Sequence, residues 1–121
     1  MSGTILVVED QEDNRQILRD LLGAHDYAMV EAENGEEALA AVKKQRPDLI
    51  LMDIQLPVLD GYEATRRIKS DPATKDIPII VVTSYALSGD EAKARASGCD
   101  AYVTKPYSPR ALLAKIKEFL P

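Results

Sequence analysis

The sequence has a single cysteine, a single phenylalanine, a single histidine and no tryptophan among its 121 residues. One cysteine, Cys99, excludes an internal disulfide and is typical of proteins in a reducing compartment, so we expect a cytoplasmic location. Without tryptophan and with one phenylalanine, the chain lacks the aromatic platform on which single-stranded nucleic acids stack. Its net charge of −5 also argues against a basic surface for nucleic acid or an anionic membrane.

Long hydrophobic runs are missing as well. No apolar stretch approaches the length that spans a bilayer, and residues 1–4 lack the basic start and apolar core of a signal peptide. The hydrophobic fraction of 45% is sufficient for one core in a chain of this length. Because no repeat or linker is visible, we expect one domain over residues 1–121 with no output domain.

Five short apolar runs, each bounded by turn or charged residues, are the most regular feature of the chain. Uninterrupted runs of this length indicate strands that are buried on both faces of a parallel sheet. The second run is more polar than the others, which favours a position near a sheet edge. The runs lie at residues 4–8, 27–32, 48–53, 78–82 and 101–104.

Helical patterns occupy the segments between these runs. Asn34 and Ser108 are suitable N-caps, and Pro109 suits a first helical position. The helix expected over 88–97 is rich in alanine with few large apolar side chains, so it should be weakly anchored. The apolar stripe of the first helix consists of Ile17, Leu18, Leu21 and Leu22.

Strands that alternate with helices at short spacing predict an α/β protein. The fold expected is flavodoxin-like, a doubly wound (βα)5 arrangement with five parallel strands in the order 2-1-3-4-5 and right-handed crossovers. In this order a crevice opens at the carboxyl edge of the sheet, between the first and third strands.

Polar residues that suit one chemistry follow four of the five predicted strands. Glu9 and Asp10 follow the first strand, Asp53 ends the third, Thr83 follows the fourth and Lys105 follows the fifth. Taken alone, each has an ordinary reading, such as a solvated strand end, a helix cap or a surface lysine. Their joint placement at one sheet edge favours a functional site.

The predicted cluster of carboxylates limits what the site can do. Two like charges about 4 Å apart repel by roughly 4 kcal/mol at an effective dielectric near 20, so the cluster must protonate or bind a cation. Oxygen donors of this kind suit Mg²⁺. The residues predict phosphoryl transfer in which Asp53 is the nucleophile, Glu9 and Asp10 hold the metal, and Thr83 and Lys105 bind phosphoryl oxygens.

Several motifs occur in one order along the chain: Val7-Val8-Glu9-Asp10, Leu51-Met52-Asp53-Ile54-Gln55-Leu56-Pro57, Asp60-Gly61, Val82-Thr83-Ser84 and Lys105-Pro106. Together they resemble the receiver domain of two-component response regulators, and the resemblance covers essentially the whole chain. The Glu9-Asp10 pair, the segment 52–57 and Gly98-Cys99-Asp100-Ala101-Tyr102 most resemble single-domain regulators of the DivK type.

The resemblance implies a role for each matching residue. Asp53 would accept a phosphoryl group from a histidine kinase or a histidine phosphotransfer protein. Thr83 and Lys105 would bind that group, and the Lys105–Pro106 bond is expected to be cis. Mg²⁺ would be held by Glu9, Asp10, Asp53 and the backbone carbonyl of Gln55.

The resemblance also implies a signalling role rather than a turnover enzyme. Tyr102 would be an aromatic switch that turns inward as Thr83 moves toward the phosphoryl group. The output face would comprise the helix over 88–97, the strand over 101–104 and the last helix. Without an output domain the chain would act on a downstream kinase or effector, as a monomer or weak dimer.

Two other protein classes share parts of this pattern. A haloacid-dehalogenase-like phosphohydrolase also forms an aspartyl phosphate, but its Asp-x-Asp pair contrasts with Asp53-Ile54-Gln55 here. A flavin-binding flavodoxin needs a phosphate loop after the first strand, where this chain has the acidic segment 9–13. A colourless purified protein would argue against the flavodoxin.

Tyr85 generates a prediction because it lies two positions after Thr83, at a place that in similar receiver domains tunes hydrolysis of the acyl phosphate. We expect the bulky ring to shield the phosphoryl group, so Tyr85→Ala should speed dephosphorylation. The measurement is the decay rate of phosphorylated protein. An unchanged rate in the variant would contradict the prediction.

Overall fold

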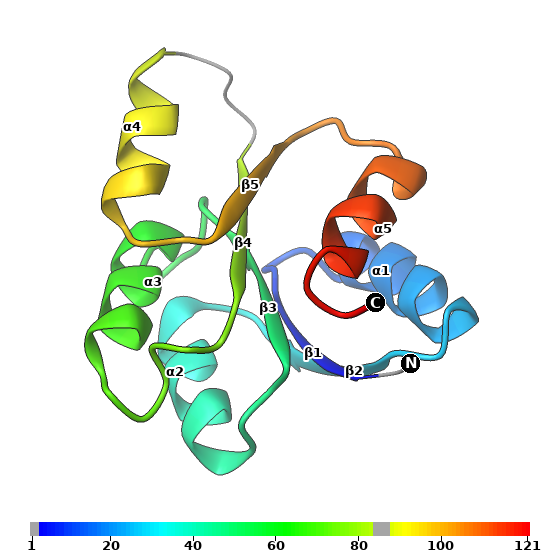
Figure 1. Ribbon diagram of the computed structural model, residues 1–121, viewed down its shortest axis with the longest axis horizontal. Helices are drawn as coiled ribbons and strands as arrows, with labels where there is room; N and C mark the ends of the chain where they lie inside the picture. The colour runs from blue at the N-terminus through cyan, green and yellow to red at the C-terminus, as the bar shows by residue number, and fades with distance from the viewer. Residues whose placement is uncertain (1–2, 84–87) are drawn as a thin grey trace.

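The computed structural model describes residues 3–83 and 88–121 of the chain. Strands and helices alternate throughout these described residues (Figure 1). The strands are β1 (Thr4–Val8), β2 (Ala28–Ala32), β3 (Leu49–Asp53), β4 (Ile79–Thr83) and β5 (Ala101–Thr104). The helices are α1 (Glu12–Ala24), α2 (Gly35–Lys44), α3 (Gly61–Ser70), α4 (Ser88–Ala96) and α5 (Pro109–Lys117).

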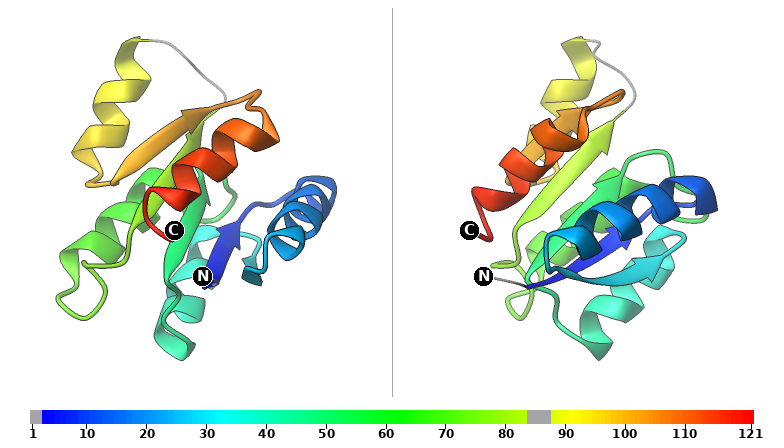
Figure 2. Two further views of the ribbon diagram at one scale, coloured as in Figure 1. Left: turned by 45° about the vertical axis from the view of Figure 1, so that its right-hand side comes forward. Right: turned by 90° about the vertical axis from the view of Figure 1, so that its right-hand side faces the viewer.

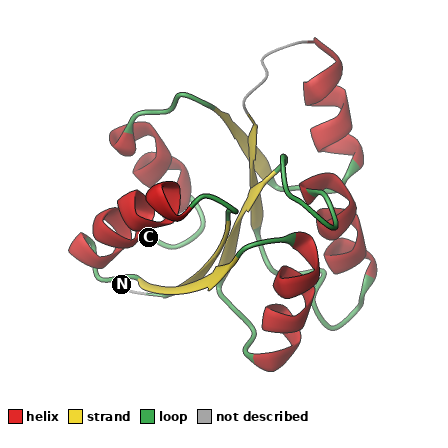
Figure 3. Ribbon diagram, turned by 180° about the vertical axis from the view of Figure 1, so that it is seen from behind, coloured by secondary structure: helices red, strands yellow, loops and turns green. Residues whose placement is uncertain are grey.

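All strand pairs are parallel, and the sheet has the order β2-β1-β3-β4-β5. This confirms the fold predicted from the sequence. Helices α1 and α5 cover one face of the sheet, and α2, α3 and α4 lie on the other (Figures 2 and 3). The more polar β2 lies at an edge of the sheet, as its composition indicated.

The two faces of the sheet are filled by alternate residues of the same strands, because successive side chains of a strand point to opposite sides. On β3, Leu49 and Leu51 belong to the cluster with α1 and α5, whereas Ile50 and Met52 belong to the cluster with α2 and α3. All five residues of β3 and of β4 are buried. Both faces of these strands therefore belong to a core, and their polar ends emerge only at the carboxyl edge.

The helix ends follow the local sequence signals. The Asn34 side chain accepts a hydrogen bond from the Glu37 amide, and the Ser108 hydroxyl accepts one from the Ala111 amide. Pro109 opens α5. Both side chains satisfy amides that would otherwise lack a partner at a helix start.

The prediction that Ile17 belongs to the buried apolar stripe of α1 is wrong. Ile17 is 58% exposed, whereas Leu18 and Leu22 are buried. A residue one position away is rotated by about 100° around the helix axis, and the third buried residue of α1 is Arg15. The buried face is thus centred on Arg15, Leu18 and Leu22, which leaves Ile17 in solvent.

Two further points concern the extent of the described chain. Tyr85, to which we assign a shielding role from the sequence, lies outside the described residues. Among the residues that are described, none of the helices has the length and apolar character needed to cross a bilayer.

Val58, in the loop between β3 and α3, has a backbone conformation that suits glycine. Its φ is +69°, its side chain is 78% exposed, and the Leu59 amide donates to the Pro57 carbonyl across it at 2.7 Å. This i to i+2 bond around a positive φ is the rare and strained γ-turn. For a β-branched residue the strain is on the order of 1–2 kcal/mol.

We therefore expect Val58→Gly to raise the free energy of unfolding by about 0.5–1 kcal/mol, after allowance for the greater entropy of glycine in the unfolded chain. Urea denaturation measures this change. Val58→Ala is the matched control, because it removes the same exposed methyl groups but keeps the Cβ that causes the strain. A glycine variant that is no more stable than the alanine variant would contradict the strain argument.

Candidate functional site

The candidate site is built from residues at which buried strands reach the carboxyl edge of the sheet. Glu9 directly follows β1, Asp53 is the last residue of β3, Thr83 is the last of β4 and Lys105 directly follows β5. The register sets Asp53 opposite Val82 and Thr83 opposite Thr104. Parallel pairing therefore brings residues from distant parts of the chain to the same level of the sheet.

Three carboxylates converge at this edge. Glu9, Asp10 and Asp53 each offer an oxygen atom that lies within 4.8 Å of the others. Glu9 and Asp53 are buried, with 4% and 5% of their surface exposed, whereas Asp10 is half-buried. An all-oxygen donor set of this size fits Mg²⁺, whose protein ligands are carboxylates and carbonyls and which keeps several waters.

Lys105 provides the positive charge nearest to these acids among the described residues. Its Nζ atom lies 2.7 Å from Asp53 Oδ2 and 3.3 Å from Glu9 Oε1. Burial by itself lowers the pKa of Lys105, but the hydrogen bond and charge of Asp53, together with Glu9, outweigh it and raise that pKa. The ammonium group therefore stays charged and offsets part of the repulsion between the acids.

Glu9 is an acid whose pKa is raised by its place in the cluster. Burial, followed by the contact with the Asp53 carboxylate, raises the pKa of Glu9 from 4.5 to about 7. Its Oε2 atom accepts a hydrogen bond of 3.0 Å from the Gln11 amide, which favours the charged form but does not cancel the other effects. Burial and the nearby Asp53 carboxylate therefore favour the protonated form of Glu9.

Asp53 is held by the loop that follows it. Its Oδ1 atom accepts a hydrogen bond of 2.9 Å from the Gln55 amide, two residues further on. Gly61 at the start of α3 packs so closely that a Cβ there would lie 2.1 Å from the Asp53 carbonyl oxygen. The loop can close on the strand end only because this position carries no side chain.

Thr83 and Tyr102 lie on the neighbouring strands. Thr83 is buried, and its carbonyl oxygen accepts a hydrogen bond of 2.6 Å from the Lys105 amide. Tyr102 pairs with Val81 on β4 and packs, partly buried, against the α2 and α3 side of the core. The Lys105–Pro106 bond is cis, as the resemblance implied.

Sequence reasoning missed Arg15, which lies in α1 beside this edge. It is 7% exposed, and its Nη1 atom donates to the Glu9 carbonyl oxygen at 2.8 Å. The available signal was a lone basic residue in the first turn of a helix that begins in an acidic segment. That pattern also fits a solvated ion pair, so only the tertiary structure distinguishes the two.

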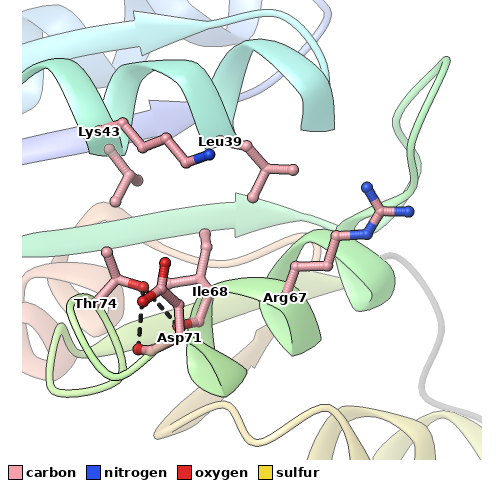
Figure 4. A pocket seen from close by; sticks show the side chains of 7 residues that line it. Leu39, Lys43, Arg67, Ile68, Asp71 and Thr74 are labelled. Atoms are coloured by element: carbon pink, nitrogen blue, oxygen red, sulfur yellow. Dashed lines mark hydrogen bonds between the residues drawn. The ribbon is translucent and has the colours of Figure 1, made fainter.

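A separate pocket of about 240 Å³ lies between α2 and α3 and contains none of the residues predicted to form the site (Figure 4). The Thr74 hydroxyl donates to the Ile68 carbonyl at 2.7 Å, and the Thr74 amide donates to the Asp71 carbonyl at 2.9 Å. These polar groups complete the end of α3, so the pocket has a structural explanation.

Comparison with known proteins gives consistent matches over nearly the whole chain. The family model described as response regulator receiver domain matches residues 5–117. The polar-differentiation response regulators DivK of Brucella anthropi and Brucella ovis are 44% and 42% identical over 120 residues. Each match covers 99% of this chain and 98% of the relative.

Solved structures show the same similarity. A putative response regulator from Chloroflexus aurantiacus has a TM-score of 0.94 and 31% identity, with 99% of this chain and 98% of the other covered. The receiver domain of a sensor histidine kinase from Pseudomonas aeruginosa has a TM-score of 0.91 and 34% identity over the same shares. That structure holds a magnesium ion in its active site cleft.

The raised pKa of Glu9 predicts how stability depends on pH in metal-free protein. Between pH 4.5 and about 7 the unfolded chain releases the Glu9 proton while the folded protein retains it, so the stability due to protonated Glu9 is lost as pH rises through about 7. We expect Glu9→Gln to be more stable than the wild type at pH 8, by on the order of 2 kcal/mol, and to differ little at pH 4.5.

Urea denaturation in the presence of EDTA at both pH values measures this effect. Glu12→Gln is the control, because Glu12 is exposed and its hydrogen bonds with Arg15 and Arg19 lower its pKa. The control should not become more stable at pH 8. A Glu9→Gln variant that shows the same difference from wild type at both pH values would rule out titration of Glu9 as the cause.

Proposed function

Because this chain belongs to the response regulator receiver domain family, we propose that it is a phosphoacceptor switch of a two-component or phosphorelay system. Asp53 accepts a phosphoryl group from a phosphohistidine partner in a reaction that depends on Mg²⁺. The partner is a histidine kinase or a histidine phosphotransfer protein. The chain itself is the substrate of this reaction rather than a turnover enzyme.

The observation that carries this proposal is the position of the Asp53 carboxylate. It is 5% exposed, it receives the Lys105 ammonium at 2.7 Å, and two further carboxylates lie beside it. In the transfer, an Asp53 oxygen forms a bond to phosphorus while the bond from phosphorus to the histidine nitrogen breaks. The electron pair of that bond stays on the leaving imidazole.

The remaining residues of the site would hold Mg²⁺ or bind the phosphoryl group. Glu9, Asp10, Asp53 and the backbone carbonyl of Gln55 are the groups that would hold Mg²⁺. When bound, the metal offsets the negative charge of the acids and of the phosphoryl group. Lys105 donates to Asp53 Oδ2 before transfer and to a phosphoryl oxygen afterwards. Thr83 donates a hydrogen bond from its hydroxyl to the phosphoryl group.

The change in charge at Asp53 supplies the signal. Phosphorylation adds about −1.5 to −2 charges and three acceptor oxygens. Thr83 moves toward them, and its carbonyl bond to the Lys105 amide couples this movement to the end of β5. Tyr102, on β5 and paired with Val81 of β4, then turns inward, and the surface formed by α4, β5 and α5 changes.

The output in this proposal is an interaction with another protein. A kinase or effector reads the altered surface of α4, β5 and α5. This surface includes a pocket of about 260 Å³ whose lining contains Arg95, Tyr102 and Lys115. An aromatic ring at the wall of the pocket gives the switch a direct way to change its shape.

Incubation with a small-molecule phosphodonor and Mg²⁺, followed by intact-mass measurement, tests the assignment. The wild type should gain one phosphoryl group, Asp53→Ala should gain none, and EDTA should abolish the gain. Asp13→Ala is the matched control, since Asp13 is an exposed acid in the first turn of α1, close in sequence to Glu9 and Asp10. A phosphoryl group on Asp53→Ala would overturn the central role of Asp53.

A further inference from the structure

Arg15 is a buried, positively charged residue that donates a hydrogen bond to a backbone carbonyl. It lies in the first turn of α1, is 7% exposed, and donates from Nη1 to the Glu9 carbonyl oxygen at 2.8 Å. Removing a guanidinium from water is unfavourable unless its donors are paired. The placement therefore needs compensation from other groups.

The other donors of Arg15 are paired with carboxylates from two elements. Nη2 lies 2.7 Å from Glu12 Oε2 on α1, and Nε lies 3.1 Å from Glu31 Oε1 on β2. Glu33 Oε1 lies 3.8 Å from Nη1. Since the guanidinium is planar, these partners on different elements fix its plane and thus the direction of the Nη1 bond.

The Glu9 carbonyl that receives this bond belongs to the peptide unit that joins the two acids. A peptide unit is planar, so its carbonyl oxygen shares a plane with the nitrogen and Cα of Asp10. On the other side, the Glu9 amide donates to the Ala32 carbonyl at 3.0 Å. With both sides tied, the backbone from which the Glu9 and Asp10 side chains leave is held in place.

From this geometry we propose that Arg15 is a positioning residue, which orients the carboxylates of Glu9 and Asp10 for a divalent cation without occupying them. This inference rests on the proposed function, because it takes Glu9 and Asp10 as metal-holding residues. Lys105 contacts the Glu9 and Asp53 carboxylates directly, whereas Arg15 donates to the Glu9 carbonyl. Carboxylate oxygens thus stay available to the metal.

The direction in which metal affinity changes after loss of Arg15 distinguishes a positioning role from a purely electrostatic one. Removing a positive charge near a cation site should strengthen metal binding if the charge acts only through space. Removing a group that orients the ligands should weaken binding instead, typically by 10- to 100-fold in metal sites of proteins. A weaker metal affinity after loss of Arg15 is therefore evidence for positioning.

Arg19 offers a matched control in the same network. Its Nη2 atom lies 2.6 Å from Glu31 Oε1 and 3.1 Å from Glu12 Oε1, so it shares two of the three carboxylate partners of Arg15. Its side-chain hydrogen bonds go to Glu12, Gln16 and Glu31 rather than to Glu9. Arg19→Met therefore removes the same charge and disturbs the same ion pairs while keeping the Glu9 contact.

The experiment is calorimetric titration of MgCl2 into metal-free wild type, Arg15→Met and Arg19→Met at low ionic strength. We expect the dissociation constant to rise about tenfold in Arg15→Met and to stay equal or fall in Arg19→Met. With a small-molecule phosphodonor, the Mg²⁺ concentration for half-maximal rate should rise in Arg15→Met, while the rate at saturating Mg²⁺ stays near the wild-type value.

The outcomes distinguish this inference from the proposed function. If the wild type binds Mg²⁺ and Arg15→Met binds it equally or more tightly, the positioning role is overturned and the proposed function stands. If the wild type itself fails to bind Mg²⁺, both are overturned. A matching loss of affinity in Arg19→Met would also overturn the positioning role.

A second variant covers the case in which Arg15→Met does not fold, as judged by circular dichroism. Arg15→Lys keeps the charge on a single donor nitrogen but lacks the planar fork that reaches Glu9, Glu12 and Glu31 together. Its dissociation constant for Mg²⁺ should rise by about threefold, less than for complete removal of the group. Wild-type affinity in Arg15→Lys would then overturn the proposal.

Discussion

Repulsion between buried carboxylates is the constraint on which the rest of this structure depends. Glu9, Asp10 and Asp53 offer oxygens within 4.8 Å of one another at the edge of a sheet whose strands are buried on both faces. At such separations each like-charged pair is unfavourable by roughly 4 kcal/mol. The fold tolerates them because Lys105 lies at hydrogen-bonding distance and because Glu9 shifts its pKa toward neutrality. The same repulsion leaves the edge ready for a cation.

Close contacts hold the acids on one side of this edge, and a backbone hydrogen bond joins the strand ends on the other. Gly61 allows the loop after β3 to close against the Asp53 carbonyl, and Arg15 ties the loop after β1 to α1 and β2. On the other side, Thr83 and Lys105 are joined through their backbones at the ends of adjacent strands. A change of charge at Asp53 is thus next to the part of the sheet that carries the proposed output surface.

Much of the fold could be predicted because its determinants are local. Uninterrupted apolar runs such as Leu49 to Met52 encode strands, and caps such as Asn34 and Ser108 encode helix starts. The alternation of elements predicted a parallel sheet, and the sheet has the flavodoxin-like order that was expected for it. Family membership supports the same fold. Prediction failed at Ile17, because the margin of an apolar stripe depends on which neighbours pack against the helix.

The sequence by itself determined the positions of the strands, the residues that end them and the family to which the chain belongs. It could not determine which charged groups meet, because Lys105 and Asp53 are 52 positions apart and their separation depends on every intervening crossover. Only the tertiary structure decided that Glu9 is buried enough to titrate near neutral pH, and that Arg15 turns inward to the Glu9 carbonyl. Burial and orientation are properties of the packed neighbours of a residue, and periodicity along the chain carries no record of them.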